Sequence, residues 1–114
     1  MYVMIELDKE RQLRYDFNAI ADVEERAGLG IVAMFNEDRV GFHSIRLLLW
    51  GGLKWKDRGL TVDRAGTMIN TYLQNGGTIE VLMEKIREAL QKSGIISYQE
   101  VDEEEGNVTA ETVN

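Results

Sequence analysis

Residues 42–55 read FHSIRLLLWGGLKW, and only there do apolar residues crowd every side of a would-be helix. Helical spacing places five of them on one stripe: Ile45, Leu48, Leu49, Gly52 and Leu53. Leu47 and Trp50 add large apolar groups on flanks that an ordinary surface helix leaves polar. The stretch is too short to span a bilayer. It therefore predicts a buried central helix, with the core centred on Leu48, Leu49 and Trp50.

The pair Gly51-Gly52 lies inside this helical pattern. Each glycine costs a helix roughly 1 kcal/mol relative to alanine. Such a cost indicates that another element approaches the helix closely at this point, or that the helix ends near Leu53.

Two β-prone segments open the chain, at residues 2–7 and 11–15, with Asp8-Lys9-Glu10 between them. They predict an N-terminal β-hairpin. A lone hairpin is only marginally stable, so we expect its apolar side to pack against helices.

The next helix is predicted to begin at Asn18, a favourable N-cap, and to end at Ala27, because Gly28 suits a left-handed C-cap. Glu24 lies near the edge of its apolar stripe. We expect a salt bridge from Glu24 to Arg46 of the central helix, in preference to a catalytic role.

Two further helices are predicted after the central one. Thr61 is the N-cap of the first, which runs to Gln74, and Thr78 is the N-cap of the second, which ends at Gly94. The expected fold is thus α+β and mostly α, with the hairpin packed on a bundle of about four helices. We expect one domain over residues 1–94 and an acidic tail over residues 95–114.

Charge is distributed unevenly along the chain. Residues 95–114 hold six acids and no base, whereas residues 1–94 hold 14 acids and 13 bases. Residues 102–114 have almost no bulky apolar side chain, so we expect the tail to be disordered and to contribute little to folding. Lys and Arg form no cluster in the sequence. This argues against binding to nucleic acid and to anionic membrane surfaces.

The sequence argues against cysteine chemistry and against secretion. The chain has no cysteine, which excludes disulfides, thiolate metal sites and cysteine nucleophiles. Its first residues lack the basic and long apolar regions of a signal peptide, so we expect a cytosolic protein.

Two features could suggest chemistry, and both have plainer interpretations. Residues 28–33 match G-x-G-x-x-A, but a dinucleotide site needs a strand before the first glycine, and here we expect a helix. We predict a helix C-cap followed by a short apolar turn through Phe35. His43, the only histidine, and Ser44 lack partners at catalytic or metal-binding spacing, so we expect them to serve as polar residues near a helix start. We expect no enzymatic activity, cofactor or metal.

The order of motifs resembles that of the small tail assembly chaperones of long-tailed phages and prophages, including related gene-transfer-agent proteins. The resemblance covers about residues 3–92. In chain order, its motifs are IELD at 5–8, LRYDF at 13–17, NAIADVEE at 18–25, LLWGGL at 48–53 and LTVD at 60–63.

The resemblance implies a non-enzymatic protein of the host bacterium's cytoplasm that covers the tape measure protein, helps to recruit tail tube protein and is absent from the mature virion. In many such families a ribosomal frameshift also makes a longer form that contacts the tube protein. We expect this chain to be the short form, without such a C-terminal domain, which leaves the recruitment of tube protein open.

Apolar residues beyond those of the central stripe are candidates for binding a partner. Met and aromatic side chains adapt to varied apolar helix surfaces, and Phe42, Trp55, Met68 and Tyr72 are the candidates selected here. Charged neighbours place Trp55 at an edge of the domain. We expect an exposed apolar strip near Trp55 and Tyr72 that binds the tape measure protein and joins copies into a homo-oligomer. The alternative for each residue is that it fills this domain's own core.

Two other functions stay open at this point. One is a small cytosolic adaptor or regulator that uses its helical body and acidic tail for protein contacts. The other is an enzyme that uses carboxylates such as Asp16, Asp22 or Glu24, although their spacing gives no support for it.

Overall fold

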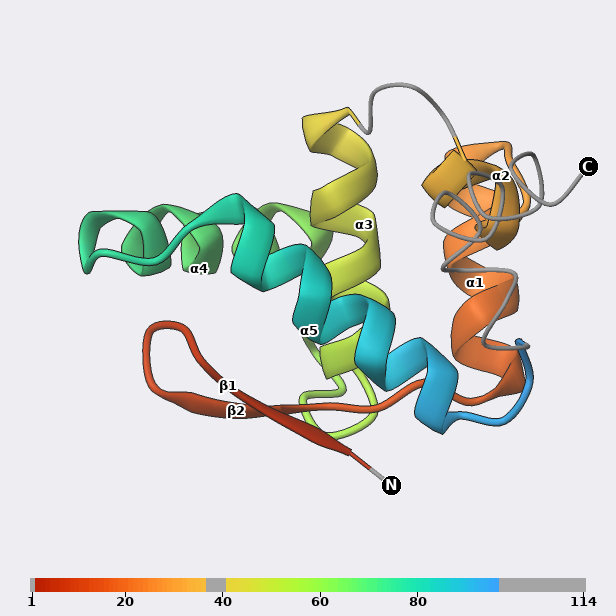
Figure 1. Cartoon of the computed structure of the whole chain (residues 1–114), viewed down its shortest axis with the longest axis horizontal. Coiled ribbons are helices and arrows are strands. Elements are labelled where there is room, and N and C mark those ends of the chain that lie inside the picture. Colours follow the sequence, from red (N-terminus) through yellow and green to blue (C-terminus); the bar gives the residue numbers. More distant parts are fainter. Residues whose placement is uncertain (1, 37–40, 97–114) are drawn as a thin grey trace, which may run out of the picture.

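The computed structural model describes residues 2–36 and 41–96. In this part of the chain, a two-stranded hairpin precedes five helices (Figure 1). The elements are β1 (Val3–Glu6), β2 (Glu10–Leu13), α1 (Phe17–Ala27), α2 (Ile31–Asn36), α3 (Phe42–Leu53), α4 (Val62–Gln74) and α5 (Ile79–Lys92). The predicted α+β, mostly α fold with an N-terminal hairpin is confirmed. The tail from residue 97 onward lies outside the described residues.

Helix α3 is the centre of the fold, as its sequence predicts. It stands between α4 and α1 in Figure 1 and also contacts α5 and β2. Ile45 and all residues from Leu47 to Leu53 are buried, and Leu48 and Leu49 have no exposed area. A helix this apolar is stable only when other elements cover it on several sides, so the remaining elements assemble around it.

Replacing Leu49 with alanine should lower the free energy of unfolding by about 2–5 kcal/mol, because it removes packed methyl groups and leaves a cavity. Chemical denaturation would measure the change. The matched control is Leu73→Ala on α4, where leucine is exposed, and there the effect should stay within about 0.5 kcal/mol. Equal effects at the two positions would remove Leu49 from the core.

The glycine pair of α3 is a point of close approach, and the helix continues to Leu53. A Cβ atom at Gly51 would lie 2.3 Å from Cγ2 of Val23 in α1. A Cβ atom at Gly52 would lie 2.8 Å from Cδ2 of Leu13 and from Cζ of Tyr15. The pair therefore lets α1 and the hairpin both dock on the last turns of α3.

Gly51→Ala should destabilise the protein by about 1–3 kcal/mol, although alanine is the better helix former, because Val23 is in the way. Thermal or urea unfolding would show the loss. Gly59→Ala is the control, since a Cβ atom there meets nothing within 4 Å. A stabilised Gly51→Ala protein would contradict the close packing of α1 on α3.

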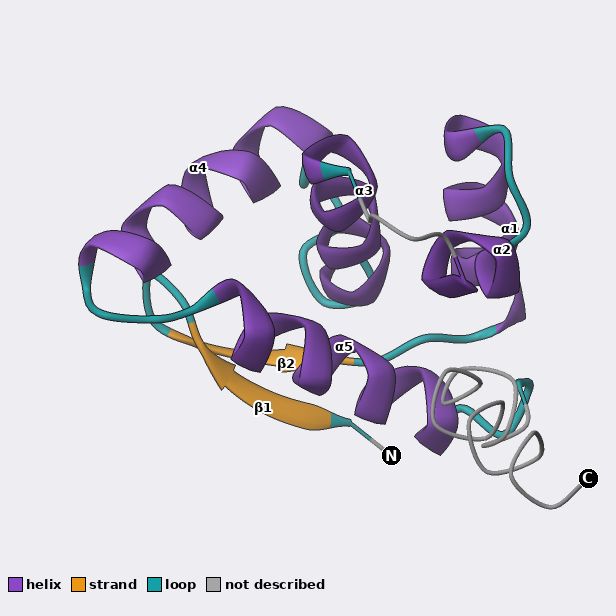
Figure 2. Cartoon of the chain, turned by 45° about the horizontal axis from the view of Figure 1, so that its top comes forward, coloured by secondary structure: helices purple, strands orange, loops and turns teal. Residues whose placement is uncertain are grey.

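The hairpin attaches to the helices through alternate side chains. Its strands are antiparallel, with Val3 opposite Leu13 and Ile5 opposite Arg11. Val3, Ile5 and Leu13 are buried, and α5 packs across β1 (Figure 2). Beyond β2, the buried Tyr15 hydroxyl donates to the carbonyl of Leu48, and burial raises the pKa of Tyr15. The hairpin is thus tied to α3 by packing and by one buried hydrogen bond.

Tyr15→Phe should cost about 1 kcal/mol near neutral pH, because it removes that hydrogen bond. The raised folded-state pKa means that the contribution of Tyr15 is fully present below the pKa of an unfolded tyrosine, about 10, and declines as the pH rises above it. Between pH 8 and 11, the free energy of unfolding should therefore decrease more steeply with pH for the native chain than for Tyr15→Phe. Parallel curves would contradict the burial of this hydroxyl.

The first helix begins earlier than the sequence indicated. Asp16, not Asn18, is the N-cap of α1, because its Oδ1 accepts a hydrogen bond of 2.8 Å from the amide of Ala19. The predicted stop is confirmed, since Gly28 has φ of 73°. The expected apolar turn through Phe35 is instead the short helix α2. Asp16 and Asn18 are both favourable N-cap residues, and N-cap propensity alone did not distinguish them.

The last two helices begin at the predicted residues. Thr61 and Thr78 each accept a hydrogen bond from an amide in the first turn, at Arg64 and Val81. Ile96, beyond the end of α5, is buried with the rest of the core, so packing extends two residues past the predicted boundary at 94. Over the residues described, no helix combines the length and apolar character needed to cross a membrane.

Candidate functional site

The four predicted partner-binding residues lie in different environments. Met68 and Tyr72 are buried in the domain's own core, so the expected exposure of Tyr72 is wrong. Phe42, at the start of α3, is 82% exposed, and Trp55 is half-buried just beyond the end of α3. The structure does not bring the four into one patch.

Tyr72 has a clear structural role at the turn between α4 and α5. Its hydroxyl donates to the carbonyl of Thr78 at 2.7 Å and accepts from the amide of Thr78 at 3.1 Å. A Cβ atom at Gly77 would lie 2.3 Å from the Tyr72 ring, so the turn passes directly over it. These contacts fix how α5 leaves α4.

Trp55 is held against the hairpin. Its indole N–H donates to the carbonyl of Gln12 in β2 at 3.0 Å. Its ring stacks on Tyr2 with 6.5 Å between ring centroids. The predicted edge position is correct, but the indole is anchored and does not stand free.

A row of exposed apolar side chains continues from Trp55 across β1. Tyr2 and Met4 point outward, with 43% and 38% of their surface exposed, because they alternate with the buried Val3 and Ile5. Met4 and the 45% exposed Val81 of α5 line a hollow of about 320 Å³ that reaches the edge of Tyr72. We call Trp55, Tyr2, Met4 and Val81 the hairpin strip.

The hairpin strip runs from Trp55 to the hollow beside Tyr72, the two residues near which an apolar surface was predicted. Its other members, Tyr2, Met4 and Val81, were not predicted from the sequence. The alternation in residues 2–7 was a usable signal for Tyr2 and Met4. No sequence signal placed Val81 beside them, because that contact depends on how α5 crosses the hairpin. Glu6, Glu10 and Lys85 line the same hollow and give the strip a charged border.

The outer edge of β1 carries unpaired main-chain groups. On β2, the carbonyl of Gln12 and the amide of Arg14 point away from β1 and are bonded to Trp55 and to the carbonyl of Gly52. In an antiparallel pair the groups of Met4 and Glu6 then point away from β2. These groups have no hydrogen-bond partner within residues 2–36 and 41–96. An edge of this kind is able to pair with another strand.

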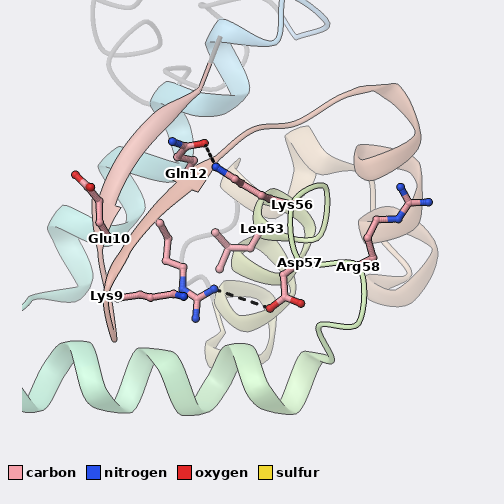
Figure 3. Close-up of a pocket in the computed structure, with 8 residues that line it drawn as sticks. Lys9, Glu10, Gln12, Leu53, Lys56, Asp57 and Arg58 are labelled. Carbon is pink, nitrogen blue, oxygen red and sulfur yellow. Dashed lines mark hydrogen bonds and ion pairs between the residues drawn. The ribbon is translucent and has the colours of Figure 1, made fainter.

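A polar hollow of about 420 Å³ lies on the other side of the hairpin, between β2 and the turn after α3 (Figure 3). Arg11 pairs there with Asp57 at 3.9 Å and with Asp8 at 2.7 Å, and its hydrogen bond lowers the pKa of Asp8. Lys56 donates to the side chain of Gln12 at 2.9 Å. Arg11, Asp57 and Lys56 therefore each have a partner within the protein.

Other residues singled out in the sequence have structural partners. Glu24 does not pair with Arg46; its Oε2 accepts a hydrogen bond of 2.7 Å from the amide of Ile31 at the start of α2. Arg46 instead lies 3.3 Å from Asp63 and 2.9 Å from Nδ1 of His43. In the G-x-G-x-x-A segment, a carboxylate thus occupies the position that a phosphate would need. Among the residues described, no three acidic or histidine side chains cluster as metal ligands would.

Basic residues from three segments of the chain come together in space. Arg14, Arg26, Lys54, Lys56 and Arg58 gather around the two tryptophans, Trp50 and Trp55. The sequence did not indicate this cluster, because Arg14 and Arg26 are distant along the chain from residues 54–58. The folding of α1, β2 and the end of α3 onto one another brings these charges together.

Comparison with known proteins adds no further constraint. No family model matches this sequence, and neither the curated proteins nor the solved structures contain a significant match.

Proposed function

We propose that this protein is a phage tail assembly chaperone that binds the tape measure protein. The proposal rests on the order of motifs in the sequence. The structural observation that supports a binding site for the tape measure protein is the hairpin strip. In this proposal the protein acts in the cytoplasm of the host bacterium and assists tail tube assembly. It catalyses no reaction and does not remain in the mature virion.

The hairpin strip suits an apolar helix surface. Its side chains are partly exposed, so a partner gains apolar burial without unfolding the domain. Met4 can adapt to different partner side chains, which a chaperone of a long and variable helical chain requires. Glu6, Glu10 and Lys85 at its border limit how far the apolar contact extends.

Covering a long tape measure chain requires several copies. The unpaired edge of β1 lies beside the strip and supports self-association, since two β1 edges can pair antiparallel around Met4. Each copy then binds the tape measure protein with modest affinity, and linked copies bind with high avidity.

Co-expression with the cognate tape measure protein tests this proposal. The native chain should convert the tape measure protein from insoluble to soluble, with several copies per tape measure chain by native mass spectrometry. Met4→Glu and Val81→Glu should each reduce the soluble fraction several-fold, because a carboxylate in the contact would have to be desolvated.

Leu29→Glu is the matched control, because Leu29 is 41% exposed and lies outside the strip. It should rescue the tape measure protein as well as the native chain does. Circular dichroism should give native helical content for all three variants. A tape measure protein that is equally insoluble with and without the native chain would overturn the proposed function.

A further inference from the structure

The structure has a second hollow, of about 430 Å³, between the start of α1 and the end of α3. Its lining combines both tryptophans of the chain with basic residues. The basic residues of the lining are Arg14, Lys54 and Arg58, and Asp16 is its acidic residue. We call this hollow the tryptophan pocket.

Four cations lie over the two indole rings. Arg26 and Lys54 lie 4.5 and 5.3 Å from the ring centroid of Trp50. Arg14 and Lys56 lie 5.1 and 5.7 Å from that of Trp55. Cation–π contacts hold these side chains in place without neutralising their charge.

The tryptophan pocket has an excess of positive charge. Lys54 pairs with Asp22 at 2.8 Å, and Asp16 caps α1. Within the described part of the chain, no acid forms a salt bridge with Arg14 or Arg58, which line the pocket, or with Arg26 or Lys56, which lie over its tryptophan rings. Preorganised, unneutralised cations around aromatic rings form a site for an acidic ligand.

We propose that the tryptophan pocket binds an acidic peptide segment, and that its occupant is residues 100–105 of the same chain. This segment reads EVDEEE, which places five carboxylates in six residues, and no base follows Lys92. The charge of the segment is complementary to that of the pocket. The inference does not rest on the proposed function, because its test uses no tape measure protein, although Trp55 belongs to both surfaces.

The position of the chain's last described residues favours binding within one molecule. Ile96 is buried in the core, and the chain around it lies next to the start of α1 in both views (Figures 1 and 2). Asp16, Asn18 and Ala19 at that start form one wall of the pocket. The carboxylates at 102–105 follow Ile96 by six to nine residues, a reach of roughly 20–30 Å when extended. Tethering at this length gives an effective concentration in the millimolar range, above that of any other copy in dilute solution.

A nucleic acid is a poorer occupant than an acidic peptide. Residues 1–94 hold 14 acids and 13 bases and so attract a free polyphosphate only weakly, whereas the acidic segment is already attached. Docking mainly through charge also predicts release at high salt, with little change in the melting temperature of the core.

The two tryptophans provide the measurement, since both lie in the pocket and the chain has no others. The test uses the native chain and a full-length neutral-tail variant, Glu100→Gln, Asp102→Asn, Glu103→Gln, Glu104→Gln and Glu105→Gln. In ¹H–¹⁵N spectra at low salt, the two indole signals should differ between these chains. In 0.5 M NaCl the native signals should move to the positions of the neutral-tail variant.

A synthetic peptide of residues 97–110 then tests the site itself. The neutral-tail variant should bind it at least about tenfold more tightly than the native chain does, because the native tail competes. Adding Lys56→Gln and Arg58→Gln to the neutral-tail variant should weaken peptide binding about tenfold, since each removes an attractive charge. The control pair Arg64→Gln and Lys9→Gln, neither of which lines the pocket, should leave it unchanged.

Several results would overturn this inference. Identical indole signals in the native and neutral-tail chains at low salt would show that the tail does not dock. Native signals that change between 50 and 500 μM protein would assign the occupant to a second copy. An oligothymidine that binds the neutral-tail variant more tightly than the peptide does would make the pocket a nucleic-acid site.

Discussion

Burial of α3 on several sides at once is the constraint on which the rest of the structure depends. An apolar helix of twelve residues leaves no long polar face for water, so α1, α4, α5 and β2 must all pack on it. Gly51 and Gly52 make this possible at one end, because a side chain at either position would collide with Val23 or with the Leu13–Tyr15 segment. The glycines lower helix propensity and allow closer packing, and the packing dominates.

The same end of α3 determines what the surface presents. Trp50 lies in α3 and Trp55 just beyond its end, and each indole N–H donates to a main-chain carbonyl, of Leu60 and Gln12 respectively. These bonds fix the rings, and the fixed rings position the surrounding cations. Trp50 and Trp55 thus connect the packing at the end of α3 with the charged surface site.

Trp55 belongs to both proposed binding regions. One side of its surroundings is apolar and continues through Tyr2 and Met4 to Val81, whereas the other carries Arg14 and Lys56. An apolar helix and an acidic segment would therefore bind close to each other, on different sides of Trp55. The anchoring of Trp55 keeps both surfaces preformed, which lowers the entropy cost of binding.

By itself the sequence determined the elements: the hairpin, the central helix, and the helices that begin at Thr61 and Thr78. Periodicity and capping are local, so they are readable along the chain. Tertiary structure alone decided that Tyr72 is buried, that Glu24 accepts from the amide of Ile31, and that Met4 and Val81 border one hollow. It also decided that Arg14 and Arg26 join the bases of residues 54–58 around the two tryptophans. Each of these depends on which faces meet when the elements pack, and residues distant in sequence carry no local signal of that contact.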